Sequence, residues 1–167
     1  MAKTDCGSDR FIRAVAMPRV QGIPYFLKAK PMSSSRDVVF PAGRHALYEL
    51  HRYSPAIRSG GFLFVSGQVG SRADGSPEPE LDEQVRLAFK NLNAILAEAG
   101  CSFGDVIDVT VFMVDPERHF ARAWAVAAEF WGEAPYPTAT AIGVTWLSGF
   151  QFEIKVIARL PEAAAAA

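Results

Sequence analysis

Two adjoining stretches, LDEQVRLAFKNLNAILAEAG at residues 81–100 and DVIDVTVFMVD at residues 105–115, decide the fold class. In the first, apolar residues recur every three or four positions and charged residues occupy the remaining positions. This spacing predicts an amphipathic helix that ends at Gly100. The second stretch is rich in β-branched residues and partly alternates, which predicts a strand that ends before Pro116. The sequence therefore predicts a helix followed by a strand that pack in one hydrophobic core.

Strand and helix signals continue on both sides of this unit. The apolar run GFLFVSGQVG at 61–70 predicts a buried strand, and SRADGSPEPE after it predicts a loop. The stretch ERHFARAWAVAAEFWG at 117–132 has one broad apolar face and predicts a second helix. Residues 136–160 contain two apolar runs around Ser148 and Gly149, which predicts a closing hairpin. Upstream, two short β-leaning pieces at 38–40 and 47–53 predict a hairpin or a bent edge.

This order of elements predicts an α+β domain with a mixed sheet and two helices on one face. Two strand–helix–strand crossovers, over 61–115 and 105–146, place both helices on the same side of the sheet. The opposite face is expected to be apolar as well, because several large apolar residues remain for it: Phe62, Phe64, Phe112, Val144 and Phe152. A face of this kind without helices predicts burial against copies of the same chain in an obligate homo-oligomer.

Composition favours a single soluble domain and excludes several classes of protein. The chain has 167 residues, of which half are hydrophobic, and a formal net charge of −1. This charge gives no electrostatic reason to expect nucleic acid, and no run is long enough to span a membrane. The two cysteines and three histidines have no metal-ligand spacing, so no metal is expected. A reducing, cytoplasmic setting is the default expectation.

The chain divides into an extension, a domain and a tail. Residues 1–31 are expected to form an N-terminal extension that is either an arm packed on the domain or on a partner subunit, or a poorly ordered addition. Pro31 and the stretch MSSSRDVVFPAG from Met32 mark the boundary. Residues 32–162 form the domain, and residues 163–167 are an alanine tail without a packing role.

One acidic residue stands within the last apolar run. Glu153 lies between Phe152 and Ile154, so it either points to solvent or sits in a pocket. Lys155 follows two residues later on the same face, and simple pairing with a basic residue across the sheet is an alternative. A functional carboxylate is the favoured interpretation.

Several segments in order resemble the RidA (YjgF) family over roughly residues 36–161. They are YSPAIRSGGFLFVSGQVG at 53–70, EQVRLAFKNLNAILAEAG at 83–100, DVIDVTVFMVD at 105–115 and FEIKVIA at 152–158. The resemblance implies a chorismate-mutase-like fold, a homotrimer with a central barrel of sheets, and ligand clefts between neighbouring subunits. It also implies hydrolysis of enamines or imines derived from amino acids, such as 2-iminobutanoate, to a 2-oxo acid and ammonia, without a cofactor.

The resemblance also implies roles for particular residues. The family's cleft tyrosine falls on Tyr53, its strand-end Ser-Gly pair on Ser66 and Gly67, and its water-orienting glutamate on Glu153. Active members also carry an arginine in the penultimate strand that clamps the substrate carboxylate. This chain reads PTAT at 137–140 and has Ala139 at that position.

The departure extends along the same strand. Thr140 follows Ala139 as the family pattern expects, but Ala141 stands where some members carry a reactive cysteine. Alanine has no hydrogen-bond donor that could replace the planar guanidinium group of the arginine. Loss of such a charged bond, which contributes about 1.5–3 kcal/mol, predicts iminoacid activity lowered by about tenfold or more.

Three functions remain open at this point. The first is a divergent enamine or imine hydrolase, whose substrate either lacks a carboxylate or meets another cation, for which Arg58 and Arg122 of a neighbouring chain are candidates. The second is a non-catalytic trimeric binder of a small metabolite, with Thr138, Thr140 and Trp146 lining its pocket. The third is the endoribonuclease activity attached to some family members, which the near-neutral charge disfavours.

Overall fold

The computed structural model of this protein describes residues 36–42 and 45–161. The predictions for the extension at 1–31 and for the tail at 163–167 lie outside these residues. The described chain forms a seven-stranded sheet in the order β1-β2-β3-β7-β5-β6, and β4 also pairs with β7. Strands β5 and β6 are parallel, and the other pairs are antiparallel. The α+β class with a mixed sheet is therefore confirmed.

Ten helices and strands make up the described domain. Their bounds are β1 Asp37–Val39, α1 His45–His51, β2 Ala56–Ser59, β3 Phe62–Val65, β4 Gln68–Val69, α2 Leu81–Glu98, β5 Val106–Val114, α3 Pro116–Ala127, β6 Thr138–Val144 and β7 Phe152–Arg159. Short 3-10 turns at Phe103–Asp105 and Ala128–Phe130 adjoin β5 and α3. None of the helices in this part of the chain combines the length and hydropathy that crossing a membrane requires.

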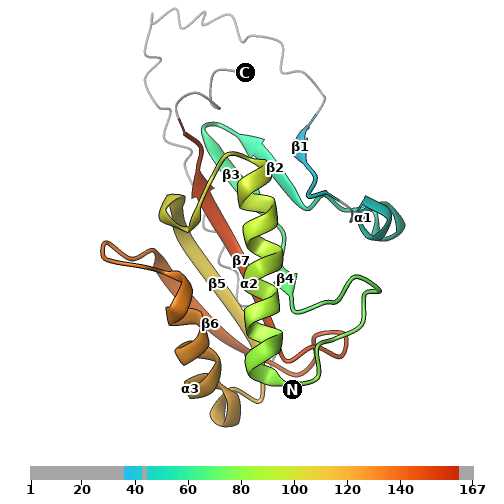
Figure 1. Ribbon diagram of the computed structural model, residues 1–167, viewed down its shortest axis with the longest axis vertical. Coiled ribbons are helices and arrows are strands. Elements are labelled where there is room, and N and C mark those ends of the chain that lie inside the picture. Colours follow the sequence, from blue (N-terminus) through green and yellow to red (C-terminus); the bar gives the residue numbers. More distant parts are fainter. Residues whose placement is uncertain (1–35, 43–44, 162–167) are drawn as a thin grey trace, which may run out of the picture. The chain divides into compact units, whose positions relative to one another are not determined.

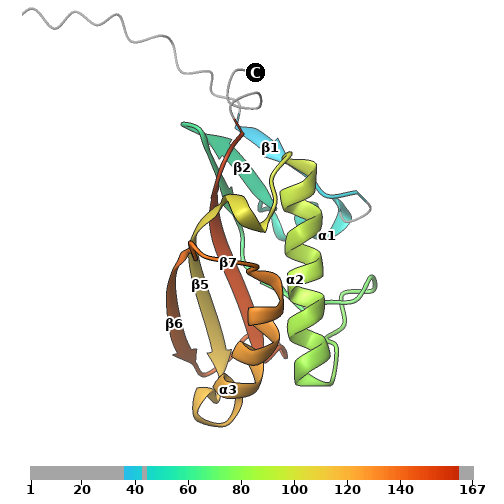
Figure 2. The same ribbon diagram turned by 60° about the vertical axis from the view of Figure 1, so that its left-hand side comes forward.

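Helices α2 and α3 lie beside each other on one face of the sheet (Figure 1), and the turned view in Figure 2 shows β5, β6 and β7 to one side of both helices. The apolar stripe predicted for residues 81–100 faces the sheet and is buried. Phe89 lies at its centre, fully buried and stacked on Phe130 with ring centroids 4.5 Å apart. Gly100 follows the helix with a φ of +78°, the left-handed conformation in which a helix commonly ends.

Both crossovers are confirmed, but the predicted hairpin of the last two strands is wrong. Strand β5 lies between β6 and β7, and β7 separates β3 from β5. The α3 crossover places β6 parallel to β5 at the sheet edge, so that β7 occupies the central position. Ser148 and Gly149 do reverse the chain with positive φ angles of 54° and 91°, but inside a longer connection. A local turn signal does not specify which strands pair.

The upstream prediction for residues 47–53 is also wrong, because most of this piece lies in α1. Tyr48 of α1 is buried and packs edge-on against Phe40 and Tyr53. The hairpin of this region instead joins β2 to β3 through Gly60 and Gly61. Both glycines have positive φ, 59° and 82°, as a two-residue hairpin turn that follows strand twist requires. The sequence analysis did not assign strand β2.

The large apolar residues predicted for the sheet face away from α2 and α3 lie on it with one exception, and they share that face with polar residues such as Thr140 and Lys155. Phe62, Phe64 and Phe112 lie on it, and Phe64 is 45% exposed. Phe152 was also expected there, but it is fully buried on the helix side, where it stacks on Phe89. Because side chains alternate along a strand, this places its neighbour Glu153 on the helix-free face. The oligomer expected to cover that face stays a prediction.

Candidate functional site

A cavity of about 440 Å³ surrounds Glu153. It brings together three residues that the sequence predicted for the site: Tyr53, Gly67 and Glu153. The remaining lining comes from α1, β4 and the connection after β6: His51, Val69, Trp146, Leu147, Ser148 and Phe150. This space is called the Glu153 cavity below. It does not include the residues predicted on β6.

Glu153 is half-buried within β7, between Val69 of β4 and Phe112 of β5. Burial raises the pKa of its carboxyl above the ordinary value for glutamate, because desolvation disfavours the charged form. Among the described residues, no Lys or Arg forms an ion pair with it. Lys155, two positions along on the same face, is exposed and does not neutralise it. The structure therefore gives no support to the cross-sheet pairing alternative.

Gly67 allows the carboxylate of Glu153 to approach the backbone. A Cβ atom at position 67 would overlap Oε1 of Glu153, so any larger residue would displace the acid. The preference for glycine here comes from the space needed by the carboxylate, and it is local to the cavity. The position of the Glu153 carboxylate therefore depends on the absence of a side chain at Gly67, although 86 positions separate the two residues in the sequence.

Tyr53 and Ser66 have different places in this site. Tyr53 lines the cavity, is 45% exposed, and has its ring edge-on to Tyr48 at 5.1 Å. The hydroxyl of Ser66 donates to the carbonyl of Ser54 at 2.7 Å, and its backbone N–H donates to Pro55 at 2.9 Å. These bonds fasten the end of β3 to the segment that follows Tyr53. Ser66 thus holds the cavity wall in place, while Gly67 faces the space.

Of two further residues in the Glu153 cavity, His51 was not predicted from the sequence, and Trp146 was predicted only for the pocket of a non-catalytic binder. His51 comes from the last turn of α1, a helix that the sequence did not predict. Trp146 follows β6 and is 74% exposed, an unusual state for tryptophan. An exposed tryptophan beside a turn is a weak signal, and its distance from Glu153 depends on the unpredicted path of residues 145–151.

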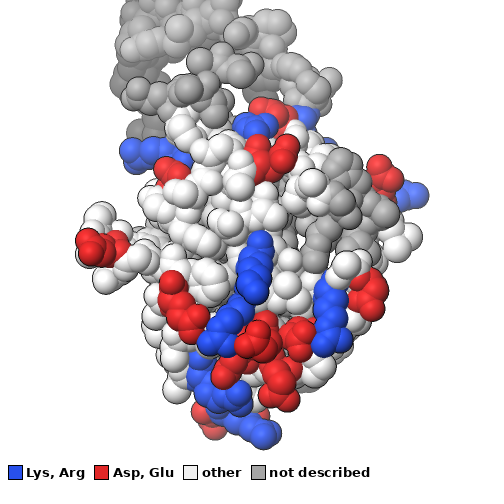
Figure 3. Space-filling view, viewed as in Figure 1, with Lys and Arg blue, Asp and Glu red and all other residues white. Residues whose placement is uncertain are grey.

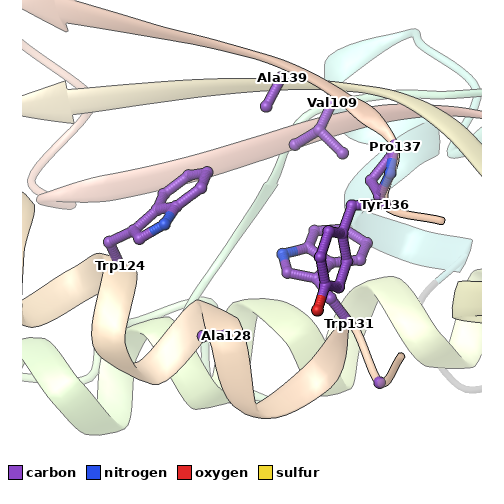
Figure 4. Close-up of a pocket in the computed structure, with 8 residues that line it drawn as sticks. Val109, Trp124, Ala128, Trp131, Tyr136, Pro137 and Ala139 are labelled. Atoms are coloured by element: carbon purple, nitrogen blue, oxygen red, sulfur yellow. The ribbon is translucent and has the colours of Figure 1, made fainter. Parts of the chain in front are cut away.

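A second cavity, of about 260 Å³, lies beside Ala139. Figure 4 shows Ala139 and Val109 on the sheet side of this space and Trp124 and Ala128 on the α3 side. Trp131, Gly132, Tyr136 and Pro137 complete the lining. This space is called the Ala139 cavity below, and none of its lining residues carries a formal charge.

Ala139 and Glu153 lie on opposite faces of the sheet within one chain. Ala139 pairs with Val109, whose side chain is buried on the helix side. Glu153 pairs with Phe112 on the other side. By the same alternation Ala141 shares the face of Ala139, whereas Thr140 shares that of Glu153. Within one chain, therefore, Ala139, at the position of the family's clamping arginine, and Glu153 do not face the same space.

The two arginines considered as replacement cations are engaged elsewhere. Arg58 forms an ion pair with Asp37 at 3.2 Å, and Arg122 forms one with Asp82 at 3.0 Å. Neither side chain lines the Glu153 cavity or the Ala139 cavity.

Charges of both signs are mixed on the face that carries the helices. Figure 3 shows acidic and basic side chains interspersed around the N-terminal half of α2. Arg86 of this group forms ion pairs with Glu83 at 2.8 Å and with Glu129 at 2.9 Å. Arginines paired in this way are less available for phosphate contacts, which nucleic-acid affinity requires.

Comparisons with known proteins agree on one family. The model of the Endoribonuclease L-PSP family matches residues 43–160. The RutC family protein YjgH of Escherichia coli K12 is 65% identical over 127 residues, covering 76% of this chain and 97% of that protein. The solved structure of protein YjgH has a TM-score of 0.73 and covers 76% of this chain and 98% of its own.

A more distant relative carries a functional name. The E. coli K12 protein named "Putative reactive intermediate deaminase TdcF" is 34% identical over 110 residues, covering 64% of this chain and 84% of that protein. The solved structure of E. coli TdcF with bound serine has a TM-score of 0.61, at 34% identity, and covers 65% of this chain and 88% of its own. With the family model and YjgH, these matches show that the chain belongs to the RidA (YjgF) family.

Proposed function

We propose that this protein is a homotrimeric RidA-family member related to the enamine and imine deaminases, with altered or lost activity on 2-imino acids. The observation that carries the proposal is the half-buried carboxylate of Glu153, packed on Gly67 beside Tyr53 without an ion-pair partner among the described residues. A carboxyl with a raised pKa in a cavity is suited to accepting and returning a proton. The name of the relative TdcF supports the same class of reaction.

Glu153 is assigned the proton transfers of imine hydrolysis. Its carboxylate accepts a proton from a water molecule as the water oxygen bonds to the imine carbon. Glu153 returns this proton to the imine nitrogen, which completes the carbinolamine. Glu153 then accepts the hydroxyl proton and passes it to the nitrogen, which leaves as ammonia as the carbon–nitrogen bond breaks and the carbon keeps the oxygen as a carbonyl. Each turnover consumes one imine and one water and yields one carbonyl compound and one ammonia. Tyr53 would line the space that this substrate occupies.

The change in activity follows from Ala139. A methyl group cannot pair with a substrate carboxylate, and no lysine or arginine lines the Ala139 cavity or the Glu153 cavity. Because the clamp position and the acid lie on opposite faces of one chain, a single ligand meets both only where two copies adjoin. This supports a cleft between subunits of a homotrimer as the working site.

We expect this protein to release ammonia from freshly generated 2-iminobutanoate about tenfold or more slowly than TdcF, because the charged clamp is missing. Glu153→Gln is expected to remove the remaining activity, since an amide cannot accept the proton. Ammonia release in a coupled assay measures both effects. Glu117→Gln, on an exposed part of α3, is the matched control and should leave the rate unchanged.

Two results would contradict this proposal. A rate equal to that of TdcF would show that Ala139 does not impair the reaction. Full activity in Glu153→Gln would remove the acid from the mechanism.

The raised pKa of Glu153 also predicts a pH dependence of stability. The folded state binds the proton more tightly than the unfolded state, so this residue lowers the free energy of unfolding as pH rises through and above the ordinary glutamate value. Glu153→Gln cannot ionise, and it should therefore gain stability relative to the parent protein at pH 7 but not at pH 4. Urea unfolding of both proteins at the two pH values measures the difference, and a gain that is equal at both would contradict it.

A second candidate is a non-catalytic trimeric protein that binds a small metabolite. The specific observation in its favour is that both cavities lack lysine and arginine in their linings. Thermal shift separates the two candidates, because stabilisation grows with ligand concentration over the dissociation constant. Stabilisation by neutral ligands without any ammonia release from imines would favour the binder, whereas turnover would exclude it.

A further inference from the structure

We infer that Gln84 is a positioning residue for the proposed reaction, because its side-chain amide holds the start of β7 in the register that brings Glu153 into its cavity. Gln84 belongs to α2, on the face of the sheet opposite to Glu153, and it does not line the Glu153 cavity. It therefore acts through the acid and does not touch the ligand. The inference rests on the proposed function in one respect, that Glu153 is taken as the reacting acid.

Gln84 is the most deeply buried polar residue in the described part of the chain, with 1% of its surface exposed. Burial of an amide is costly unless its polar groups form hydrogen bonds. Its Nε2 donates to the carbonyl of Glu78 at 2.6 Å. Its Oε1 accepts from the backbone N–H groups of Gln151 at 2.7 Å and of Phe152 at 3.3 Å. The buried amide is therefore satisfied by the backbone of two other segments.

The two bonds to β7 begin where the pairing of β7 with β4 ends. That pairing stops at Val69 and Glu153. The N–H groups of the two preceding residues, Gln151 and Phe152, donate to Oε1 of Gln84 instead. Loss of this oxygen would leave both donors without their acceptor, which costs free energy and favours movement of the strand start. Gln84 thus takes the place of a neighbouring strand directly before the acid.

The register of β7 at this point decides where Glu153 lies. Side chains alternate between the two faces of a strand, so a slip by one residue would exchange the faces of Phe152 and Glu153. Phe152 is fully buried on the helix side, and Glu153 is half-buried on the other side. A smaller movement would still disturb the carboxylate, because its contact with Gly67 leaves no room for a Cβ atom. The bonds from Gln84 therefore stabilise the productive position of the acid.

The third bond of Gln84 fixes the segment that follows β4. The carbonyl of Glu78 accepts from the Gln84 amide, and the N–H of Glu78 donates to the carbonyl of Gly70 at 2.9 Å. Gly70 itself packs on Gln84, because a Cβ atom at position 70 would overlap its backbone oxygen and its Cγ. One side chain thus connects α2 to β7 and to the loop after β4, and these two strands carry the acid and adjoin its glycine.

Gln84→Met is the main test, since methionine has a similar length and lacks the amide acceptor and donor. We expect kcat for ammonia release from 2-iminobutanoate to fall by about tenfold or more, because a misplacement of about 1 Å can cost on the order of 100-fold. KM should stay unchanged, since Gln84 does not line the cavity that holds the ligand.

The carboxyl of Glu153 reports the same change without turnover. In protein labelled with carbon-13 at the glutamate carboxyls, its signal is identified by its absence from Glu153→Gln and is followed during a pH titration. Burial raises the pKa of Glu153, so a carboxyl that leaves Gly67 for water should have a lower pKa in Gln84→Met than in the parent protein. The acid limb of the kcat/KM profile should move to lower pH with it.

Three further variants separate positioning from a general loss of stability. Ile95→Ala removes a fully buried side chain from α2 about three turns beyond Gln84, so it should lower the free energy of unfolding but leave kcat and the pKa of Glu153 unchanged. Gln84→Glu keeps an oxygen acceptor for both N–H groups and should stay closer to the parent protein than Gln84→Met. Gln84→Asn withdraws the amide by one methylene group and should behave like Gln84→Met, which keeps the test decisive if the methionine variant fails to fold.

Two outcomes would overturn the inference. The first is a parental kcat and a parental pKa of Glu153 in Gln84→Met and Gln84→Asn. The second is the same change in Ile95→Ala, which would assign the effect to stability. If the parent protein releases no ammonia, the titration of Glu153 still decides the role of Gln84. If Glu153→Gln abolishes activity and Gln84→Met keeps it, the proposed reaction stands and the inference fails, so the two failures are distinguishable.

Discussion

Replacement of Ala139 by arginine is expected to raise the rate of 2-iminobutanoate hydrolysis by about tenfold or more, because a guanidinium fork restores a charged bond to the substrate carboxylate. The side chain would leave β6 on the helix side, away from Glu153 of its own chain. The gain should therefore appear only when copies assemble, with the fork reaching the Glu153 cavity of a neighbour. Ammonia release over a dilution series of the protein measures this dependence.

Two controls separate charge and geometry from bulk. Ala139→Leu adds volume without charge and should give no gain. Ala139→Lys adds a charge without the planar fork and should give a smaller gain than arginine. If Ala139→Arg folds and assembles but hydrolyses no faster than the parent protein, the loss of activity does not arise from the clamp alone.

Phe89→Ala is expected to lower the free energy of unfolding by about 3–5 kcal/mol, the cost of losing a large buried aromatic side chain and leaving a cavity. Phe89 is fully buried and lies within 6.3 Å, between ring centroids, of four aromatic rings: Phe103, Phe130, Trp131 and Phe152. It therefore joins α2 to β7 and to the segment after α3. Urea unfolding followed by circular dichroism measures the loss.

Phe120→Ala is the matched control for this stability prediction. Phe120 lies on α3, is 41% exposed and stacks only on Trp124 among the described aromatic rings, so its loss should cost about 1 kcal/mol or less. Equal losses in the two variants would show that the cluster around Phe89 does not dominate the core.

The sequence predicted best the elements whose signal is local and periodic. The apolar stripe from Leu81 to Leu96 predicted α2 and its buried face, and the β-branched run predicted β5 nearly to the residue. The pairing of strands could not be predicted in the same way. Ser148 and Gly149 correctly indicate a reversal, but the insertion of β7 between β3 and β5 depends on pairs of residues 39 to 97 positions apart.

The secondary structure of residues 45–51 could not be predicted for a different reason. Tyr48 and Leu47 favour a strand by composition, yet the segment forms α1, in which Tyr48 packs against Phe40 and Tyr53. Tertiary contacts of this kind override weak local preferences. His51 lines the Glu153 cavity because it lies in α1, and its position could not be predicted for the same reason.

The site itself was predicted through a resemblance rather than through periodicity. Tyr53, Gly67 and Glu153 do meet in one cavity, as the family motifs implied. The face assignment was less successful, because Phe152 was placed on the face that its neighbour Glu153 occupies. The Ala139 cavity was not predicted, because Trp124, Trp131 and Tyr136 lie within thirteen consecutive positions but only the fold places them around Val109 and Ala139.

The separation of Ala139 and Glu153 by the thickness of the sheet has an evolutionary consequence. Under the proposed function, a substitution at position 139 would change which compounds are recognised and leave the packing of Glu153 on Gly67 undisturbed. The glutamate of the last strand alone would then not indicate the substrate of a homologue, whereas the residue at position 139 would.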